Sequence, residues 1–416
     1  MKHTFQTISV VGLGYIGLPT AAVIAGRGIN VIGLDVSDKV IETINSGKVH
    51  IVEPDLDIAV QAAVNSGKLI ATKTAQPADA FLIAVPTPFV GDDHTPDLSY
   101  IESAAKSIAP VLKKGDLVVL ESTSPVGATD QLVSWLTDLR PDLKFPKSSE
   151  PDCDVCVAHC PERVLPGQVL RELVENDRVI GGVTKTCAEK AVALYKVFVA
   201  GDCIVTNAKT AEMVKLTENS FRDVNIAFAN ELSVICDTHG INVWELISLA
   251  NRHPRVDILK PGAGVGGHCI AVDPWFIVSS NPDEAKLIRT ARIVNDLKPK
   301  YVKRQIIEKA EKFKNPKIAC FGLAFKPNID DLRESPAMEI VADLAQNTDC
   351  EIIAVEPNID EIPDNLSALE NVLLKPTHSA LAEADIICFL VAHKQFKEIP
   401  NEKFNEKIIL DFVNVR

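Results

Sequence analysis

The sequence is poor in aromatic residues and has no excess of positive charge. Aromatic side chains make up 5% of its 416 residues, and 43 Lys and Arg stand against 56 Asp and Glu, a formal net charge of −13. Nucleic-acid binding depends on basic surfaces that neutralise phosphates and on rings that stack with bases, and both are scarce here. We therefore expect no nucleic-acid partner. An anionic small molecule must be held by a local basic cluster.

Long uninterrupted hydrophobic runs are also lacking. The uncharged stretch over residues 8–26 is broken by Gly12, Gly14, Gly17, Pro19 and Gly26. A buried strand that enters a closely packed helix gives such a pattern, whereas a membrane span or a signal segment is apolar throughout or ends at a small-residue cleavage site. The sequence predicts a cytoplasmic protein that has no membrane partner.

The ten cysteines are too few and too irregular for a disulfide framework. Cys153, Cys156, His159 and Cys160 fall within eight residues, and zinc accepts ligands of these types. No second ligand pair stands at the spacing of a zinc ribbon or finger. We therefore predict no metal site, and whether these thiols have any role stays open.

A glycine pattern between two apolar stretches is the first motif with a chemical meaning. Gly12, Gly14 and Gly17 follow a predicted strand over residues 8–11, and a second strand begins at residue 30 and ends in Asp35. In a dinucleotide-binding unit such glycines permit a tight turn, approach of the pyrophosphate and close helix packing, and the acid binds the ribose diol. No Arg follows Asp35 directly, so the pattern predicts NAD rather than NADP as cofactor.

The spacing of apolar residues predicts the organisation of the rest of the chain. A helical period between Thr206 and Gly240 indicates one long amphipathic helix, which Asn207 or Thr206 can cap. A second helical stretch is predicted over residues 283–314. Apolar strands are predicted before and after this region, at residues 80–85, 117–120, 155–158, 317–322, 351–355, 385–390 and 407–411.

This pattern predicts an α/β protein with two doubly wound, Rossmann-like domains that are joined by a central helical region with one long helix. We place the first α/β domain, which contains the predicted NAD-binding loop, at residues 1–205, the helical region at residues 206–314, and the second α/β domain at residues 315–416.

A glycine-rich loop over residues 261–267 leads to Cys269, the candidate nucleophile. Backbone N–H groups of such a loop can bind an oxyanion, and a helix that started at the cysteine would lower its pKa. Asp273 lies one helical turn later, on the same side as the thiol. A buried structural cysteine in a glycine turn would give the same local pattern.

On the long helix, Glu212, Lys215, Asn219 and Arg222 are spaced so that they form one polar stripe. A solvated helix face has the same pattern as a catalytic one. The spacing alone leaves the choice open.

These motifs resemble the UDP-glucose/GDP-mannose dehydrogenase family from end to end. The resemblance rests on residues 12–17, 85–88, 122–127, 161–162, 212–219, 264–269 with Asp273, 321–326 and 333–336. It implies a four-electron oxidation of the C6 alcohol of a UDP-sugar to a carboxylate with two NAD⁺, for surface polysaccharide synthesis. It also implies that residues 206–314 form a dimerisation and catalytic region and that residues 315–416 bind the UDP-sugar. The protein would be a homodimer or higher homo-oligomer with the long helix at its interface. Residues 160–167, 251–256 and 268–275 narrow the resemblance to members that act on UDP-N-acetyl-D-mannosamine, with UDP-N-acetylglucosamine or UDP-glucose as alternative substrates.

The resemblance also implies a role for individual residues. The Cys269 thiolate would add to the intermediate aldehyde, and the resulting thiohemiacetal would be oxidised to a thioester that water hydrolyses. The catalytic residues would be Cys269, Lys215, Asp273, Glu162 and Asn219. The cofactor would contact Gly12, Gly14, Tyr15, Ile16, Gly17, Asp35, Thr87, Thr123, Thr129 and Arg333. The substrate would contact Arg163, Val164, Lys215, Asn219, Arg222, His253, Arg255, Gly266 and Lys326.

One position departs from the family pattern. Members usually have a Lys or Arg two residues after the final Asp, whereas Asp411 is followed there by Val413. Either Arg416 compensates or the contact is lost.

Two other classes of protein stay open. A single-step hydroxyacid dehydrogenase would need neither Cys269 nor the last α/β domain, and a nucleotide-sugar sensor would not need the thiol loop.

Overall fold

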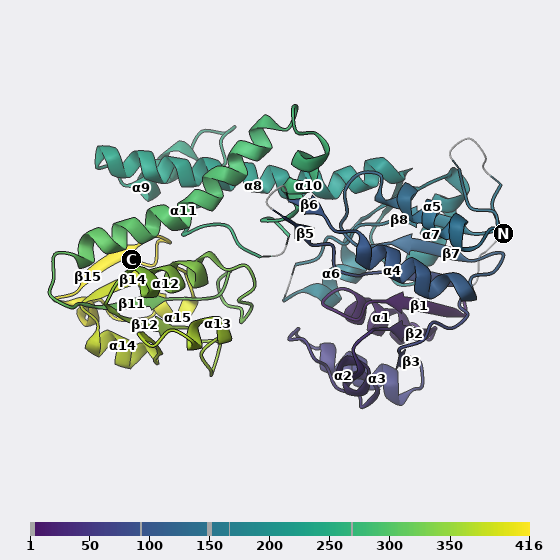
Figure 1. The fold of residues 1–416 in the computed structure, drawn as a ribbon, viewed down its shortest axis with the longest axis horizontal. Helices are drawn as coiled ribbons and strands as arrows, with labels where there is room; N and C mark the ends of the chain where they lie inside the picture. The colour runs from purple at the N-terminus through teal and green to yellow at the C-terminus, as the bar shows by residue number, and fades with distance from the viewer. Residues whose placement is uncertain (1–4, 92–93, 148–151, 166, 268) are drawn as a thin grey trace. The chain divides into compact units, whose positions relative to one another are not determined.

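The structure is a computed structural model that describes residues 5–91, 94–147, 152–165, 167–267 and 269–416. It divides into two compact units, Met1–Glu218 and Asn219–Arg416 (Figure 1). The boundary falls within the long helix α8, Ala208–His239. These units are defined by the contacts within each of them, which do not test the predicted division into three domains. That division stays a prediction.

The first unit is built on an eight-stranded sheet with the order β10-β9-β8-β7-β4-β1-β2-β3. All neighbours are parallel except β8 and β9. The strands are β1 Thr7–Val11, β2 Asn30–Leu34, β3 Leu69–Thr72, β4 Ala80–Ile83, β7 Leu117–Leu120, β8 Cys156–His159, β9 Arg178–Gly182 and β10 Cys203–Asn207. A separate hairpin consists of β5 Phe89–Val90 and β6 Thr95–Pro96.

Helices cover both faces of this sheet because alternate residues of its central strands are apolar on both sides. In β4, Leu82 packs into one core with residues of α1, α3 and α7, whereas Phe81 and Ile83 pack into a second core with α4 and α5. The helices are α1 Gly17–Gly26, α2 Asp38–Asn45, α3 Leu56–Asn65, α4 Ser99–Ile108, η1 Ala109–Val111, α5 Ala128–Leu139, α6 Val169–Glu175 and α7 Lys185–Tyr195.

The second unit combines helices with a five-stranded parallel sheet of order β13-β12-β11-β14-β15. Its strands are β11 Lys317–Phe321, β12 Glu351–Val355, β13 Val372–Leu374, β14 Ile386–Phe389 and β15 Ile408–Asp411. Its helices after α8 are α9 Val243–Ala250, α10 Asp273–Ser280, α11 Lys286–Ala310, α12 Pro336–Asn347, α13 Asp364–Ser367, α14 Thr377–Glu383, α15 Lys394–Lys397 and η2 Asn401–Phe404. Two cores again lie on opposite faces of the sheet, one with α11 and α12 and the other with α14 and α15.

The predicted α/β class is confirmed, with two Rossmann-like sheets and a helical region between them in the chain. The long helix has the predicted ends. Asn207 Oδ1 accepts the Thr210 N–H at 2.9 Å, and Gly240 ends the helix with a φ of +65°. The second helical stretch is shorter than predicted, because α11 spans only Lys286–Ala310.

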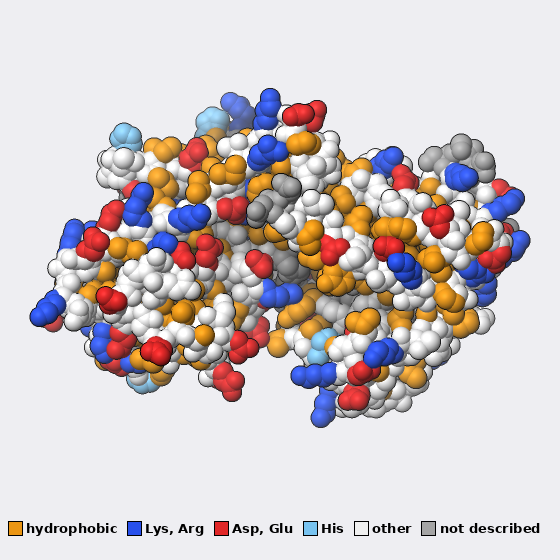
Figure 2. All heavy atoms as spheres, in the orientation of Figure 1, with side chains coloured by type: hydrophobic (Ala, Val, Ile, Leu, Met, Phe, Trp, Pro, Cys, Tyr) orange, Lys and Arg blue, Asp and Glu red, His pale blue; other side chains and the backbone are white. Residues whose placement is uncertain are grey.

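Among the helices in the described ranges, none has both the length and the apolar character that crossing a bilayer requires. On the face drawn in Figure 2, acidic and basic side chains are interspersed over both units, with hydrophobic side chains among them.

Candidate active site

The glycine loop after β1 lies beside β4, where the order of the first sheet reverses direction. Gly12 has a φ of +90°, and a Cβ there would lie 2.6 Å from the Ala84 carbonyl oxygen. A Cβ on Gly17 would lie 1.8 Å from the Gly12 oxygen, whereas a Cβ on Gly14 would meet nothing within 4 Å. Gly12 and Gly17 are therefore required by the turn and by helix packing, and open space at Gly14 fits an approaching pyrophosphate.

Asp35 follows β2 and binds this loop directly. Its Oδ2 accepts the Leu13 N–H and its Oδ1 accepts the Ser37 N–H, each at 2.9 Å. Each carboxylate oxygen can accept more than one hydrogen bond, so ribose hydroxyls can still bind. Asp35, which is predicted to bind the ribose hydroxyls, therefore also holds the glycine loop in position.

The segments that follow β4 and β7 are joined by side-chain hydrogen bonds. Thr87 Oγ1 donates to the Thr123 carbonyl at 2.5 Å. Ser122 Oγ accepts the Val85 N–H at 2.9 Å and donates to the Val85 carbonyl at 2.7 Å. These residues border the carboxyl edge of the parallel strands, which is where doubly wound sheets bind ligands.

Glu212 of α8 caps the neighbouring helix α5. Its Oε2 accepts the Gly127 N–H at 2.7 Å, and its Oε1 accepts the N–H of Thr129 at 2.7 Å and its hydroxyl at 2.6 Å. Glu212 is buried, and this burial raises its pKa. The predicted polar stripe is therefore not a uniform face, since Glu212 is buried, Lys215 and Asn219 are half-buried, and Arg222 is exposed.

Glu162 belongs to a buried ionic network that sequence reasoning did not find. Arg178 Nη1 donates to its Oε2 at 2.5 Å, and the Arg163 N–H donates to its Oε1 at 2.6 Å. Nearby, Tyr195 donates its hydroxyl proton to Glu121 at 2.6 Å. Burial, together with the charge of Glu162, raises the pKa of Glu121 to about 7. Arg178 is the first residue of β9 and Glu121 follows β7, so their local pattern gave no sign of this network.

The other candidates of the first unit are more accessible. The Arg163 guanidinium pairs with Glu218, with Nη2 2.5 Å from Oε1 and Nε 3.0 Å from Oε2. Lys215 and Val164 are half-buried.

In the second unit, the glycine-rich loop packs against the segment between β11 and α12. A Cβ on Gly266 would lie 2.3 Å from the Glu334 oxygen, and one on Gly267 would lie 2.9 Å from the Phe325 ring. Gly262 donates its N–H to Asn230 of α8 at 2.9 Å. This close contact brings the loop that precedes Cys269 against the segment that contains Lys326 and Arg333.

Cys269, Asp273 and Asn219 form a connected group. The Asp273 N–H donates to the Cys269 carbonyl at 2.8 Å, so the two residues lie one turn apart as predicted. Asp273 is buried, and its Oδ2 accepts a hydrogen bond from Asn219 Nδ2. No helix starts at the thiol, because residues 269–272 form a turn and α10 begins at Asp273 with Pro274 in its first turn.

Four basic candidates of this unit are exposed, namely Arg222, His253, Arg255 and Arg333. Arg333 forms a bidentate pair with Asp331, at 2.9 Å from Nε and 2.6 Å from Nη2. Arg255 donates its N–H to His253 Nδ1 at 3.3 Å in the turn after α9. Arg222 is exposed on α8, and Lys326 is half-buried.

The second sheet has an acid in the same place as Asp35. Glu356 follows β12, and its Oε2 accepts the N–H groups of Leu323 and Ala324 at 2.8 and 3.1 Å. Burial opposes ionisation of Glu356, but the hydrogen bond and charge of His393 leave its pKa lowered. The loop that leads to Lys326 is thus fixed by an acid, as the first glycine loop is.

Val413 lines a cavity of about 220 Å³ with the glycine loop and the start of α12, including Gly262, Gly264 and Pro336. The Arg416 guanidinium lies 4.3 Å from the Phe404 ring centroid and donates to the Phe396 carbonyl at 2.6 Å. Arg416 is therefore held elsewhere, and the wall at this position is apolar.

The fold and the loop at Gly12–Gly17 define an NAD-binding dehydrogenase. Residues 6–199 match the NAD binding domain, residues 209–297 the central domain and residues 319–416 the UDP binding domain of one family. The chain belongs to the UDP-glucose/GDP-mannose dehydrogenase family.

Several known proteins are similar over nearly the whole chain. UDP-N-acetyl-D-mannosamine dehydrogenase of Campylobacter jejuni is 62% identical over 96% of this chain and 98% of its own. NDP-N-acetyl-D-galactosaminuronic acid dehydrogenase of Ralstonia nicotianae is 63% identical over 98% of this chain and 95% of its own. The solved UDP-D-ManNAc dehydrogenase of Pyrococcus horikoshii aligns with a TM-score of 0.87 and 39% identity, over 99% of this chain and 96% of its own.

Proposed function

We propose that the protein oxidises UDP-N-acetyl-D-mannosamine at C6 to UDP-N-acetyl-D-mannosaminuronate, for the synthesis of a surface polysaccharide. The observation that favours this reaction most is the group of Cys269, Asp273 and Asn219. A buried carboxylate one turn from a thiol, with an amide that orients it, suits an oxidation that passes through a covalent sulfur adduct. A hydroxyacid dehydrogenase or a sensor would have no use for this group.

NAD⁺ fits the open space at Gly14 and the Asp35 carboxylate, and when bound it accepts the hydride in each oxidation. In the proposed sequence, Lys215 takes the proton of the C6 hydroxyl or stabilises its alkoxide. The Cys269 sulfur then bonds to the aldehyde carbon, which becomes an sp³ centre that can donate a hydride. After the second oxidation, water that Asp273 orders breaks the carbon–sulfur bond, which releases the carboxylate and restores the thiol.

We propose that Arg163, Arg222, His253, Arg255 and Lys326 bind the nucleotide sugar, with Val164, Asn219 and Gly266 beside it. The basic members offer the local positive charge that an acidic chain needs to hold a diphosphate. Tyr15, Ile16, Thr87, Thr123, Thr129 and Arg333 are proposed to contact the cofactor, although the buried Thr129 hydroxyl is bonded to Glu212.

The test is the NADH yield per mole of substrate over a panel of UDP-sugars. Two NADH for each UDP-N-acetyl-D-mannosamine, with far slower turnover of UDP-N-acetylglucosamine and UDP-glucose, is expected. One NADH for each sugar would contradict the four-electron reaction. The similarity to the Ralstonia nicotianae enzyme favours an N-acetylgalactosamine nucleotide as second candidate, so UDP-N-acetylgalactosamine belongs in the panel.

We propose that the protein is a homodimer or higher homo-oligomer with α8 at the interface. Phe221, Phe228 and Ile235 are exposed on α8 and follow one another at intervals of seven residues, so they share one face. The side chain of Phe221 is 72% exposed, which is costly for an isolated chain in water. Sedimentation of Phe221→Asp with Phe228→Asp should show a smaller assembly than that of the unchanged protein.

We also propose that the protein acts in the cytoplasm. The buried cysteines of the two sheets, among them Cys156, Cys320 and Cys388, are free thiols, as is usual in a reducing compartment. Fractionation of cells that produce the untagged chain would test this location.

A further inference from the structure

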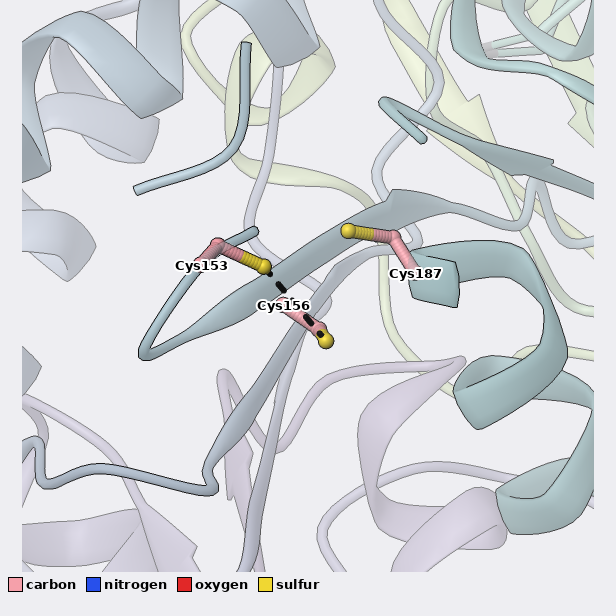
Figure 3. A group of neighbouring side chains, drawn as sticks. All are labelled: Cys153, Cys156 and Cys187. Carbon is pink, nitrogen blue, oxygen red and sulfur yellow. Dashed lines mark hydrogen bonds between the residues drawn. The ribbon is translucent and has the colours of Figure 1, made fainter. Parts of the chain in front are cut away.

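Three cysteines of the first unit converge from separate elements (Figure 3). Cys153 lies in the loop before β8, Cys156 is the first residue of β8, and Cys187 lies in the first turn of α7. Their sulfur atoms all lie within 4.8 Å of one another, and those of Cys153 and Cys156 are 3.9 Å apart. Among the His, Cys, Asp and Glu residues that the structure describes, these three have ligand atoms close enough together to bind one metal ion.

We propose that these three thiols bind one Zn²⁺ ion, with water as the fourth ligand, at a site separate from the reaction. Zinc binds thiolate sulfur at about 2.3 Å, so tetrahedral ligand sulfurs stand about 3.8 Å apart. The Cys153 and Cys156 sulfurs are already near that value, and the remaining separations, which are at most 4.8 Å, need a contraction of no more than about 1 Å. A disulfide would instead require the Cys153 and Cys156 sulfurs to close to about 2.05 Å.

The character of the site favours zinc over other ions. Three sulfur ligands select soft or borderline metals over Mg²⁺ or Ca²⁺. With three thiolates, Zn²⁺ leaves one net negative charge and Cu⁺ leaves two, and a smaller buried charge costs less free energy. Cys156 and Cys187 are buried while Cys153 is half-exposed, so an ion can enter at Cys153 and keep a water there.

The surroundings of Cys187 suit a thiolate ligand. Thr184 Oγ1 donates a hydrogen bond to its sulfur at 3.1 Å, and the first turn of α7 favours a negative charge. Binding then replaces the thiol protons with the ion and releases them to solvent.

The other two members of the sequence cluster lie outside the site. Alternation along β8 puts Cys156 on the face of the core that includes α7, whereas His159 points to the opposite face. Burial lowers the pKa of His159 to about 3. Cys160 follows β8 on the Cys156 side, four residues further along an extended chain.

The experiment measures zinc bound to the full chain after reduction, metal removal and reconstitution with one equivalent of Zn²⁺. The unchanged protein should retain one zinc for each chain after gel filtration, and Co²⁺ should give a thiolate-to-cobalt charge-transfer band. Cys153→Ser and Cys187→Ser should lose both signals. Cys203→Ser, which changes a half-exposed cysteine outside the cluster, should keep them. Thr184→Val should weaken zinc binding about 10- to 100-fold, because it removes a hydrogen bond to a ligand sulfur.

Far-UV circular dichroism and NADH formation check that each variant is folded. No retained zinc and no charge-transfer band in the reduced unchanged protein would overturn the proposal. Retention of zinc by folded Cys153→Ser and Cys187→Ser would also overturn it, because the ion would then lie elsewhere. A Cys153–Cys156 disulfide in protein that binds no zinc after reduction would indicate a redox pair instead.

Discussion

Asn219 of α8 donates a side-chain hydrogen bond to Asp273, the first residue of α10. This bond links the helix that contains Lys215 to the turn that contains Cys269. Asp273 is buried, so its carboxylate depends on such donors for stability. Asn219 and Asp273 are separated by 54 positions in the sequence, so only the tertiary fold brings them together.

We predict that Asp273→Asn will lower kcat at least about tenfold while the free energy of unfolding changes by less than about 1.5 kcal/mol. The substitution keeps the size of the side chain but removes the carboxylate that orders water or Lys215. Steady-state NADH formation and urea unfolding provide the two measurements. Asp283→Asn, at an exposed acid before α11, is the matched control. An unchanged kcat would mean that Asp273 only supports the fold.

Cys269→Ser should bind UDP-N-acetyl-D-mannosamine and NAD⁺ almost normally and have almost no steady-state turnover. The first oxidation needs no thiol, but a serine alkoxide is far less available at neutral pH than a thiolate. Enzyme in excess should therefore give at most a partial burst of NADH. Mass spectrometry of the intact protein should detect a retained sugar-nucleotide adduct that is absent from Cys269→Ala. Two NADH and free uronate at a near-normal rate would contradict the covalent mechanism.

Asp35→Ala should weaken NAD⁺ binding by about 1.5–3 kcal/mol, because it removes charge-assisted hydrogen bonds to the ribose. It also removes the acceptor of the Leu13 N–H, which orders the glycine loop. Titration calorimetry with NAD⁺ gives the affinity. Asp38→Ala, which changes an exposed acid at the start of α2, should bind NAD⁺ normally. Equal use of NADP⁺ and NAD⁺ by the unchanged protein would refute the assignment of Asp35.

Glu121 should make the first unit less stable as the pH rises. Its pKa is raised from 4.5 to about 7 in the folded protein, so the neutral form is favoured there. The stabilisation is complete below the unfolded pKa and is lost as the pH rises through the folded pKa. The full effect is about 3 kcal/mol. Urea unfolding from pH 5 to pH 8 should show this loss in the unchanged protein and in Glu189→Gln, at an exposed glutamate of α7, but a smaller one in Glu121→Gln. If the free energy of unfolding changed equally with pH in all three proteins, Glu121 would be excluded as the cause.

The sequence by itself determined the parts of this protein that depend on neighbouring residues. Strand and helix positions follow from the period of apolar residues, and α8 has the ends that Asn207 and Gly240 predict. The nucleotide loop could be predicted because Gly12 adopts a left-handed backbone and because a Cβ on Gly17 would collide with the Gly12 oxygen. The family and its NAD cofactor followed from motifs of this local kind.

Only the tertiary structure decided which distant side chains meet. Glu212 caps α5, Glu356 binds the loop after β11, and Cys187 joins Cys153 and Cys156. In each case the partners are separated by tens of residues. The hydrophobic pattern specifies which face of an element is buried but does not specify which element covers it, and these pairings come into being only when the elements pack.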